Sequence, residues 1–261
     1  MAASQLLTTD VVAPRDRAPQ WCEWVSSHFG GLQSDLYGDT DFDGHIAASH
    51  AGDVILTRLE ADRHRVLRTA SMVRTSDVPY LKIVAPWQGS AMVQQQGREA
   101  CARDGAWVIY DTTGTYQVGN PERVDHLIVM VPKDDVAERG QRFDGVMARR
   151  LGASGISRVA LETMRNTYLE LPNMSEAAAQ GAGELIKQLV KLSLMELAGQ
   201  ETGVSQREAL RDRIRQYVQQ NLRDPALSVD AIARALNCRR RHLYNAFAGE
   251  GESIAGYTQR L

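Results

Sequence analysis

The sequence predicts an α+β protein in which a β-rich sandwich or small barrel with flanking helices precedes a separate all-α region. Three observations lead to this prediction: short apolar runs separated by turn signals over residues 42–131, helical periodicity from residue 155 onwards, and a change in charge near residue 209. A chain of 261 residues, 43% of them hydrophobic, can form two domains with cores. We expect the domains at 1–200 and 209–261.

The N-terminal domain is expected to begin with a short helix over residues 19–31, which Gly30 and Gly31 end. Six short runs then predict strands, the last two of them rich in β-branched and aromatic residues, and Gly97–Arg98 predicts a hairpin turn between two of the others. The helical part of the domain is expected over about 133–200. The strand-like runs are 53–60, 80–86, 90–96, 99–102, 105–110 and 124–131, and the helical runs are 155–170 and about 174–199.

The last of these helices carries a wide apolar face. Leu185, Leu189 and Leu192 form a heptad-like stripe, which predicts that one side packs on the barrel while the stripe pairs with a second subunit. The alternative is a helix buried entirely within its own domain. Residues 199–208 are polar and contain two glycines, so we expect a flexible linker at 201–208.

Residues 227–247 predict two short helices joined by a tight turn. Ser228 is a good N-cap, and Asn237 tolerates the left-handed backbone that a short turn requires. The second helix is expected to bury Leu243 and Phe247 and to expose its opposite side, as in a helix-turn-helix that enters a DNA major groove. Helix pairs of this kind also occur in all-α domains that never bind DNA.

Charge favours a polyanionic partner at the C-terminal end. Residues 209–261 contain nine arginines, no lysine and five acidic residues, a net charge of +4. The whole chain carries −2, so residues 1–208 carry −6. A basic segment beside an acidic body is typical of a nucleic-acid-binding region.

A longer pattern of apolar, capping and glycine positions surrounds this motif. The positions are Ile214, Tyr217, Val218, Asp224, Pro225, Leu227, Ser228, Ala231, Ile232, Ala233, Leu236, Leu243, Phe247, Gly251, Ser253 and Tyr257. In this pattern the segment resembles the DNA-binding domain of AraC/XylS-type transcription regulators. The resemblance implies that Arg241, Tyr244 and Asn245 contact base edges, whereas Arg239 and Arg240 contact phosphates.

The segment departs from that family in two ways. Arg239 stands where the family usually has a serine that caps the recognition helix. Domains of this type also carry two helix-turn-helix units joined by a long helix, which residues 253–261 are expected to begin, and the second unit is not in this sequence. We therefore expect the 261-residue form to bind an operator weakly or not at all, unless a dimer brings two recognition helices together.

Residues His64–Val66, Arg68–Thr69 and 97–118 resemble the AraC-binding-like, cupin-shaped sensor domain of the same family. The resemblance implies a small-molecule effector, or a role mainly in dimerisation. An effector pocket would include Arg68, Trp87, Tyr110 and Tyr116, which suit a flat, acidic ligand. The alternative is that Trp87 and Tyr110 fill the core while Arg68 pairs with an acid outside the barrel.

The sequence predicts no enzyme, metal or cofactor. The six histidines contain no His-x-His pair, and His45 and His50 are expected on opposite faces of a strand. Asp39, Asp41 and Asp43 alternate like a calcium loop, but the position that needs an acid is His50. The three separated cysteines and the lack of a membrane-length apolar run predict a cytoplasmic protein with reduced thiols.

These observations together predict an effector-responsive activator of transcription. It would bind double-stranded promoter or operator DNA, act with RNA polymerase and form a homodimer. One alternative is a ligand-binding or dimerisation module that no longer binds DNA. Another is a cupin-type metalloenzyme, which the missing metal-ligand pattern opposes.

Overall fold

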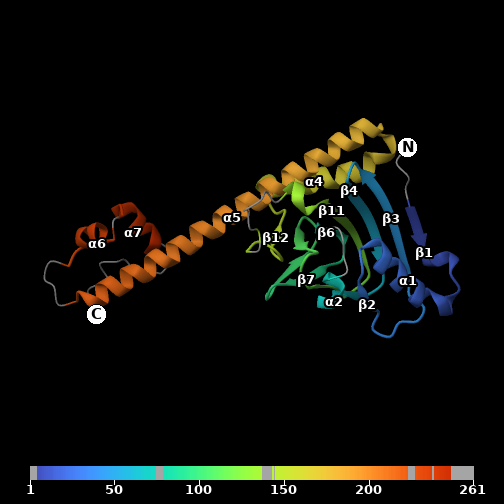
Figure 1. Ribbon diagram of the computed structural model, residues 1–261, viewed down its shortest axis with the longest axis horizontal. Helices are drawn as coiled ribbons and strands as arrows, with labels where there is room; N and C mark the ends of the chain where they lie inside the picture. Colours follow the sequence, from blue (N-terminus) through green and yellow to red (C-terminus); the bar gives the residue numbers. More distant parts are fainter. Residues whose placement is uncertain are drawn as a thin grey trace. The chain divides into compact units, whose positions relative to one another are not determined.

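In this computed structural model the described residues are 5–74, 79–136, 143, 145–222, 227–236 and 238–247 (Figure 1). Side chains are described for these residues except at positions 5, 200–209, 212, 242 and 247. The chain divides into two compact units, Met1–Glu196 and Leu197–Leu261. Each unit is described separately below.

The first unit is built on two antiparallel sheets. In the described part of the chain, the larger sheet has seven strands in the order β1-β3-β4-β11-β6-β9-β12, and the smaller has five in the order β2-β5-β10-β7-β8. The strands of the larger sheet are β1 (Gln5–Thr8), β3 (Gly44–Ala51), β4 (Val54–Ala61), β11 (Val124–Pro132), β6 (Tyr80–Gln88), β9 (Trp107–Asp111) and β12 (Arg150–Leu151). Those of the smaller are β2 (Gln33–Asp35), β5 (His64–Arg68), β10 (Tyr116–Asn120), β7 (Ala91–Gln95) and β8 (Arg98–Ala102).

The main core lies between these sheets. Alternate residues of each strand point inward, so Val84, Val108, Val118 and Val93 meet in one buried cluster. Helix α1 (Pro14–His28) adds Trp21 to the same cluster. The unit is therefore a two-layer β-sandwich with a mainly apolar core, in which burying a polar group carries a free-energy cost.

Helices cover the outer face of the larger sheet. Helix α4 (Gly155–Glu170) and the first part of α5 (Glu176–Gln220) lie along it (Figure 1). The backbone of α5 comes so close to β3 that a Cβ at Gly183 would collide with the carbonyl of Ala51. The short helices of this unit are η1 (Thr9–Val11), α2 (Ala70–Val73), α3 (Lys133–Val136) and η2 (Leu171–Asn173).

The six predicted strands are confirmed as β4, β6, β7, β8, β9 and β11, and the helix predicted at 155–170 is α4. The hairpin turn lies one residue earlier than predicted, at Gln96 and Gly97, whose φ values are 53° and 74°. Positive φ at both central residues is the geometry that closes a two-residue hairpin. Strands β3 and β10 were not predicted, because their alanines, glycines and asparagine have low strand propensity and depend on neighbouring strands.

The predicted flexible linker at 201–208 is wrong. Helix α5 continues through these residues and ends only at Gln220. The segment has no proline, and Glu, Gln and Arg are good helix formers. Gly199 and Gly203 each cost only about 1 kcal/mol relative to alanine.

The second unit has its own small core. The end of α5 packs with α6 (Val229–Ala235) and α7 (Arg240–Phe247), as Figure 1 shows. The Ser228 hydroxyl caps α6 by accepting from the Ala231 amide at 3.2 Å, as predicted. The core residues are Ile214, Val218, Ile232, Ala233, Leu243 and Ala246.

Several residues of the proposed family pattern lie outside the described part of the chain. They are Asp224, Pro225, Gly251, Ser253, Tyr257 and the side chain of Phe247, and the predicted turn residue Asn237 also lies outside it. The described helices include none with the length and apolar character needed to cross a membrane.

Candidate functional site

Two cationic side chains are buried between the sheets at one end of the sandwich. Lys82 on β6 is 1% exposed and Arg68 on β5 is 3% exposed. The strand registers place Lys82 opposite Tyr110 and Arg68 opposite Tyr116, and the two tyrosine rings lie 4.7 Å apart. We call these four residues, together with His28, the cationic end of the sandwich.

Neutral groups hold both cations in place. Lys82 Nζ donates to the Phe29 carbonyl at 2.6 Å and to the Tyr116 hydroxyl at 3.4 Å. Arg68 Nε donates to the Thr112 carbonyl at 2.9 Å, and its Nη1 donates to the carbonyls of Gly30 and Gly31. Neither cation pairs with a carboxylate from the residues that the structure describes.

The electrostatics of this end follow from burial. Burial, with the nearby charge of Arg68, lowers the pKa of Lys82 to about 7. Burial, with the charges of Lys82 and His50, lowers the pKa of His28 to about 4. Burial raises the tyrosine pKa values, so Tyr116 keeps its proton at neutral pH. The positive charge of the cationic end therefore comes from Arg68 and the protonated form of Lys82, beside tyrosine hydroxyls that stay neutral.

A shallow hollow of about 470 Å³ opens at the same end of the smaller sheet, and Arg68, Gln95 and Tyr116 are part of its lining. The buried Gln95 amide holds the backbone of Asp111, donating to its carbonyl at 2.7 Å and accepting from its amide at 2.8 Å.

Three of the four residues predicted for an effector pocket meet at the cationic end, but the inclusion of Trp87 was wrong. Trp87 lies on the outer face of the larger sheet, 5.8 Å from the ring of Tyr168 and 5.6 Å from the guanidinium of Arg58. Neighbouring residues of a strand point to opposite faces of the sheet, so Trp87 points outward from β6 whereas Pro86 points inward. The alternative is right that Tyr110 lies in the core, but its pairing of Arg68 with an outside acid is wrong, because the partners of Arg68 are interior carbonyls.

A second group of buried polar side chains lies between the sheets, at the opposite ends of β5 and β10 and on β11. His64 contacts the Asp62 carbonyl through Nδ1 at 2.7 Å and the Asn120 amide through Nε2 at 3.0 Å. Burial lowers the pKa of His64 to about 4 and that of His126 to about 3. In the described structure His126 Nε2, Asn120 Oδ1 and Trp21 Nε1 have no hydrogen-bond partner.

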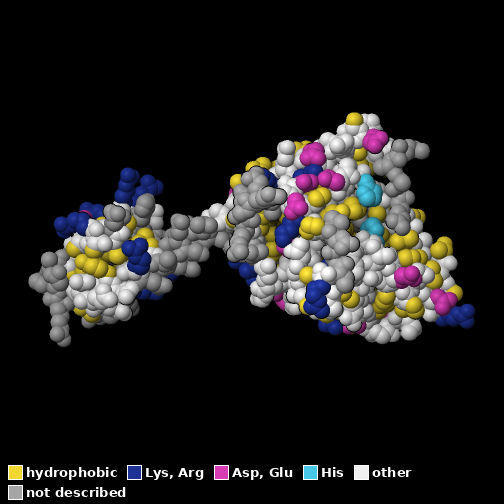
Figure 2. Space-filling model, viewed as in Figure 1, with side chains coloured by type: hydrophobic (Ala, Val, Ile, Leu, Met, Phe, Trp, Pro, Cys, Tyr) yellow, Lys and Arg dark blue, Asp and Glu magenta, His cyan; other side chains and the backbone are white. Residues whose placement is uncertain are grey.

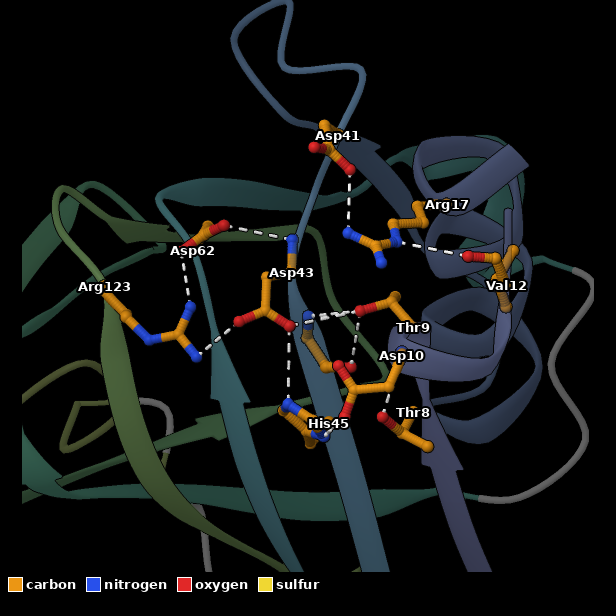
Figure 3. Close-up of polar contacts among 11 residues, drawn as sticks. Thr8, Thr9, Asp10, Val12, Arg17, Asp41, Asp43, His45, Asp62 and Arg123 are labelled. Carbon is orange, nitrogen blue, oxygen red and sulfur yellow. Dashed lines mark hydrogen bonds and ion pairs between the residues drawn. The ribbon is translucent and has the colours of Figure 1, made fainter. Parts of the chain in front are cut away.

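Asp10, Asp43 and His45 come within reach of a single cation, since their ligand atoms lie within 4.8 Å of one another. Arg123 already bridges Asp43 and Asp62 at 2.7 Å to each, as Figure 3 shows. The Thr9 hydroxyl bonds to both the amide and the carbonyl of Gly44, at 2.9 and 3.3 Å. This cluster therefore ties the N-terminal segment to β3, and its acidic charge is partly neutralised within the protein.

In the second unit, α7 separates an anchored side from an exposed polar side. Leu243 and Ala246 are 0% exposed, whereas Tyr244 is 52% exposed and Arg241 and Asn245 are also exposed. Figure 2 shows basic side chains on the surface of this unit. Arg211 on α5 donates to the Ala246 carbonyl at 2.9 Å and so holds the end of α7.

The arginines before and within α7 differ from one another. Arg239 is exposed, but Arg240 is paired with Asp230 of α6. Arg234, which the sequence reasoning missed, is also exposed. A wide hollow of about 870 Å³ is lined by Asp230, Ala233, Arg234, Cys238, Arg239 and Arg240.

The predicted dimer stripe on α5 needs a correction. Leu185 and Leu192 are 47% and 49% exposed, but Leu189 is only 8% exposed and faces the first unit's interior. Met195, one helical turn beyond Leu192, is 43% exposed and extends the exposed row. Lys187 holds the opposite side of the helix, with Nζ at 2.8 to 3.0 Å from carboxylates of Asp53, Asp135 and Glu184.

Comparisons with known proteins agree with these features. The model of the AraC-binding-like domain family matches residues 21–196. The transcriptional activator NphR of Rhodococcus sp. is 23% identical over 243 residues, which cover 85% of this chain and 70% of that protein. An uncharacterised protein encoded in the nit 5′ region of Bacillus sp. (strain OxB-1) is 21% identical over 237 residues, covering 88% and 91% of the two chains.

Among solved structures, the AraC-like transcriptional activator CuxR matches with a TM-score of 0.65 and 15% identity. The match covers 99% of this chain and 93% of CuxR, so the two proteins share a fold, a cupin-like β-sandwich with helices. The family match spans more than half of the sequence and covers every strand of the sandwich that the structure describes except β1. The chain therefore belongs to the AraC-binding-like domain family and is an AraC-family regulator.

Proposed function

We propose that this regulator binds double-stranded promoter DNA through α7 and activates transcription in response to a small-molecule effector. The observation that carries the proposal is the two-sided packing of α7. Leu243 and Ala246 anchor one side, while Arg241, Tyr244 and Asn245 leave the other side free to enter a major groove.

Different side chains have different roles in this proposal. Arg241 and Asn245 read base edges, because guanidinium and amide groups make paired hydrogen bonds with guanine and adenine. Arg239 and Arg240 contact phosphates and set the position of the helix on the duplex. Since Arg240 is paired with Asp230, it must exchange that carboxylate for a phosphate, whereas the exposed Arg239 and Arg234 need no exchange.

A homodimer completes the proposed mechanism. One recognition helix makes few phosphate contacts, and two related by a dyad bind two half-sites one helical turn apart. The exposed row Leu185, Leu192 and Met195 supplies an apolar surface for pairing two copies of α5. NphR and CuxR are both transcriptional activators, which supports an activating role with RNA polymerase as the final partner.

The proposal is tested by fluorescence anisotropy with labelled DNA from upstream of the gene and with shuffled DNA of the same composition. Wild-type protein should prefer the upstream DNA, and Arg241→Ala should lose that preference. Arg103→Gln, which removes an exposed arginine of the first unit, is the matched control and should behave like wild type. Equal affinity for both DNAs at every salt concentration would favour a ligand-binding module that no longer reads an operator.

The dimer is tested separately by sedimentation equilibrium. Leu192→Asp places a charge in the exposed row and should shift the protein toward monomer. Leu6→Asp changes another exposed leucine, on edge strand β1, and should leave the association unchanged. A monomeric wild type, or two variants that associate equally, would contradict this surface as the dimer contact.

A further inference from the structure

We propose that the cationic end of the sandwich binds a small organic anion, a carboxylate with an aromatic or similarly apolar body, held between Lys82 and Arg68. This inference names the chemical class of the effector. It rests on the proposed function only for the regulatory consequence of binding, because the binding step itself concerns the first unit alone.

The two buried cations of this end lack an opposite charge. Lys82 and Arg68 are 1% and 3% exposed, and their described partners are carbonyls, a hydroxyl and aromatic rings. Isolated buried charges are costly, and proteins ordinarily pair them with an opposite charge. His28, with a pKa of about 4, is neutral near pH 7, and no carboxylate from the described residues pairs with either cation. An anionic ligand would supply the missing opposite charge.

Arg68, Lys82 and Tyr116 also have hydrogen-bond donors that no described residue uses. Arg68 uses Nε and Nη1 for backbone carbonyls, and Nη2 makes no hydrogen bond to any residue the structure describes. Lys82 has three protons and two acceptors, Phe29 and Tyr116. The Tyr116 oxygen accepts from Lys82, so its own proton is free to be donated. These three free donors match the acceptor sites of one carboxylate.

Apolar residues around the two cations, and the hollow beside them, indicate what the rest of the ligand would be. The cationic end is surrounded by Phe29, Tyr110, Met130 and Tyr80, which favour an aromatic or aliphatic group over a sugar or a bare phosphate. The hollow beside Arg68, Gln95 and Tyr116 has a volume of about 470 Å³, within the range of small-molecule sites. Four of its lining residues are neutral glutamines, and its acid, Glu99, is hydrogen bonded to Gln94.

The test is isothermal titration calorimetry of the whole 261-residue protein at pH 7, without DNA. The probes are benzoate and phenylacetate, each compared with its neutral amide, benzamide and phenylacetamide. The acids should bind at least about tenfold more tightly than the amides, since a hydrogen bond to a charged group is worth about 1.5–3 kcal/mol. Lys82→Met should weaken the acids by about the same factor and leave the amides unchanged.

Two further measurements keep the outcome clear. Lys82→Met keeps the side-chain volume and removes a buried charge, so its melting temperature should not fall, and circular dichroism checks this. Arg103→Gln removes an exposed arginine of the same unit and should bind the acids like wild type.

The proposal is overturned if neither acid binds, if the amides bind as well as the acids, or if Lys82→Met binds like wild type. DNA titration of the same samples is read separately. Acid binding without any DNA binding would leave this site standing while removing the proposed function.

Discussion

The two candidate binding sites of this regulator, one in each unit, hold their positive charges in opposite ways. In the sandwich, Arg68 and Lys82 are almost fully buried and fixed by backbone carbonyls. In the second unit, Arg234, Arg239 and Arg241 are exposed. Buried charges act over short distances on a ligand that must shed its water, whereas exposed charges act over a Debye length and are screened by salt.

This difference indicates two kinds of recognition within one chain. A desolvated cation with fixed neighbours can select a small anion by shape and hydrogen bonding. A row of exposed arginines attracts any polyanion, and sequence is then read by the few side chains that reach base edges. Anion binding by the buried cations and DNA binding by the exposed arginines should therefore respond differently to pH, mutation and salt.

The largest expected effect is a fall in the free energy of unfolding of the sandwich at acid pH, because its buried histidines are held in their neutral form. His64 and His126 have pKa values of about 4 and 3 in the folded protein, below the ordinary value of 6.5. Below pH 6.5 the unfolded chain takes up protons that the folded chain refuses, so stability falls as pH falls toward 4. Each histidine contributes about 1.4 kcal/mol per pH unit in its window.

Urea unfolding at pH 6.5 and 5.0 measures this loss. His126→Gln should show a smaller loss than wild type, and Arg103→Gln should match wild type. Parallel losses in wild type and His126→Gln would show that His126 is not held neutral in the folded protein.

The next effect is on the alkaline side and concerns Lys82. Its folded pKa of about 7 lies below its ordinary value of 10.5, so between these values only the unfolded chain keeps the proton. Stability from this group therefore rises with pH through that window, by about 1.4 kcal/mol per pH unit. Below pH 7 the burial penalty is fully present and constant.

Comparison of wild type with Lys82→Met at pH 7.0 and 9.0 isolates this contribution. The methionine variant should be the more stable at pH 7.0, and its advantage should shrink at pH 9.0. An advantage that stays constant across this range would mean that Lys82 is paired with an anion in the folded protein.

A third effect concerns the exposed arginines and sequence preference. Arg241→Ala should reduce the preference for cognate over random DNA by about 1–3 kcal/mol, because a base contact is lost. Arg240→Ala should weaken both DNAs alike, because a phosphate contact carries no sequence information. Competition titrations with both DNAs measure the two numbers, and equal losses of preference in the two variants would reverse the assigned roles.

The smallest effect is the difference between the salt dependence of DNA binding and that of benzoate binding. Raising salt from 50 to 200 mM should weaken DNA binding by about tenfold if roughly two phosphates are neutralised, and by more for a dimer. The same change should alter benzoate binding much less, since buried charges are poorly screened. If both affinities fall with the same slope, the anion binds at the surface instead of at the cationic end.

Much of the fold was predictable because its signals are local. The strands β4, β6, β9 and β11 are rich in β-branched and aromatic residues, and the Ser228 cap needs only its own neighbours. Part of the cationic end was predictable too, since Arg68 and Tyr110 lie in segments that resemble a known sensor domain.

Lys82 was missed for a physical reason. Lysine in a strand ordinarily points to solvent, and the alternation within β6 alone cannot say which face is inside when both faces are covered. The register with β9 and β11, together with the helices over the outer face, places Lys82 between the sheets. Leu189 was misassigned on the same ground, because a helix with a wide apolar face does not reveal where its buried side ends.

The sequence by itself determined six of the sandwich strands, the capped helix pair and the basic character of the C-terminal unit, because propensity, capping and charge act between near neighbours. Only the tertiary structure decided which charges are buried and which are exposed, since burial depends on segments far apart along the chain. Phe29 and Lys82, or Asp230 and Arg240, meet only after the chain has folded.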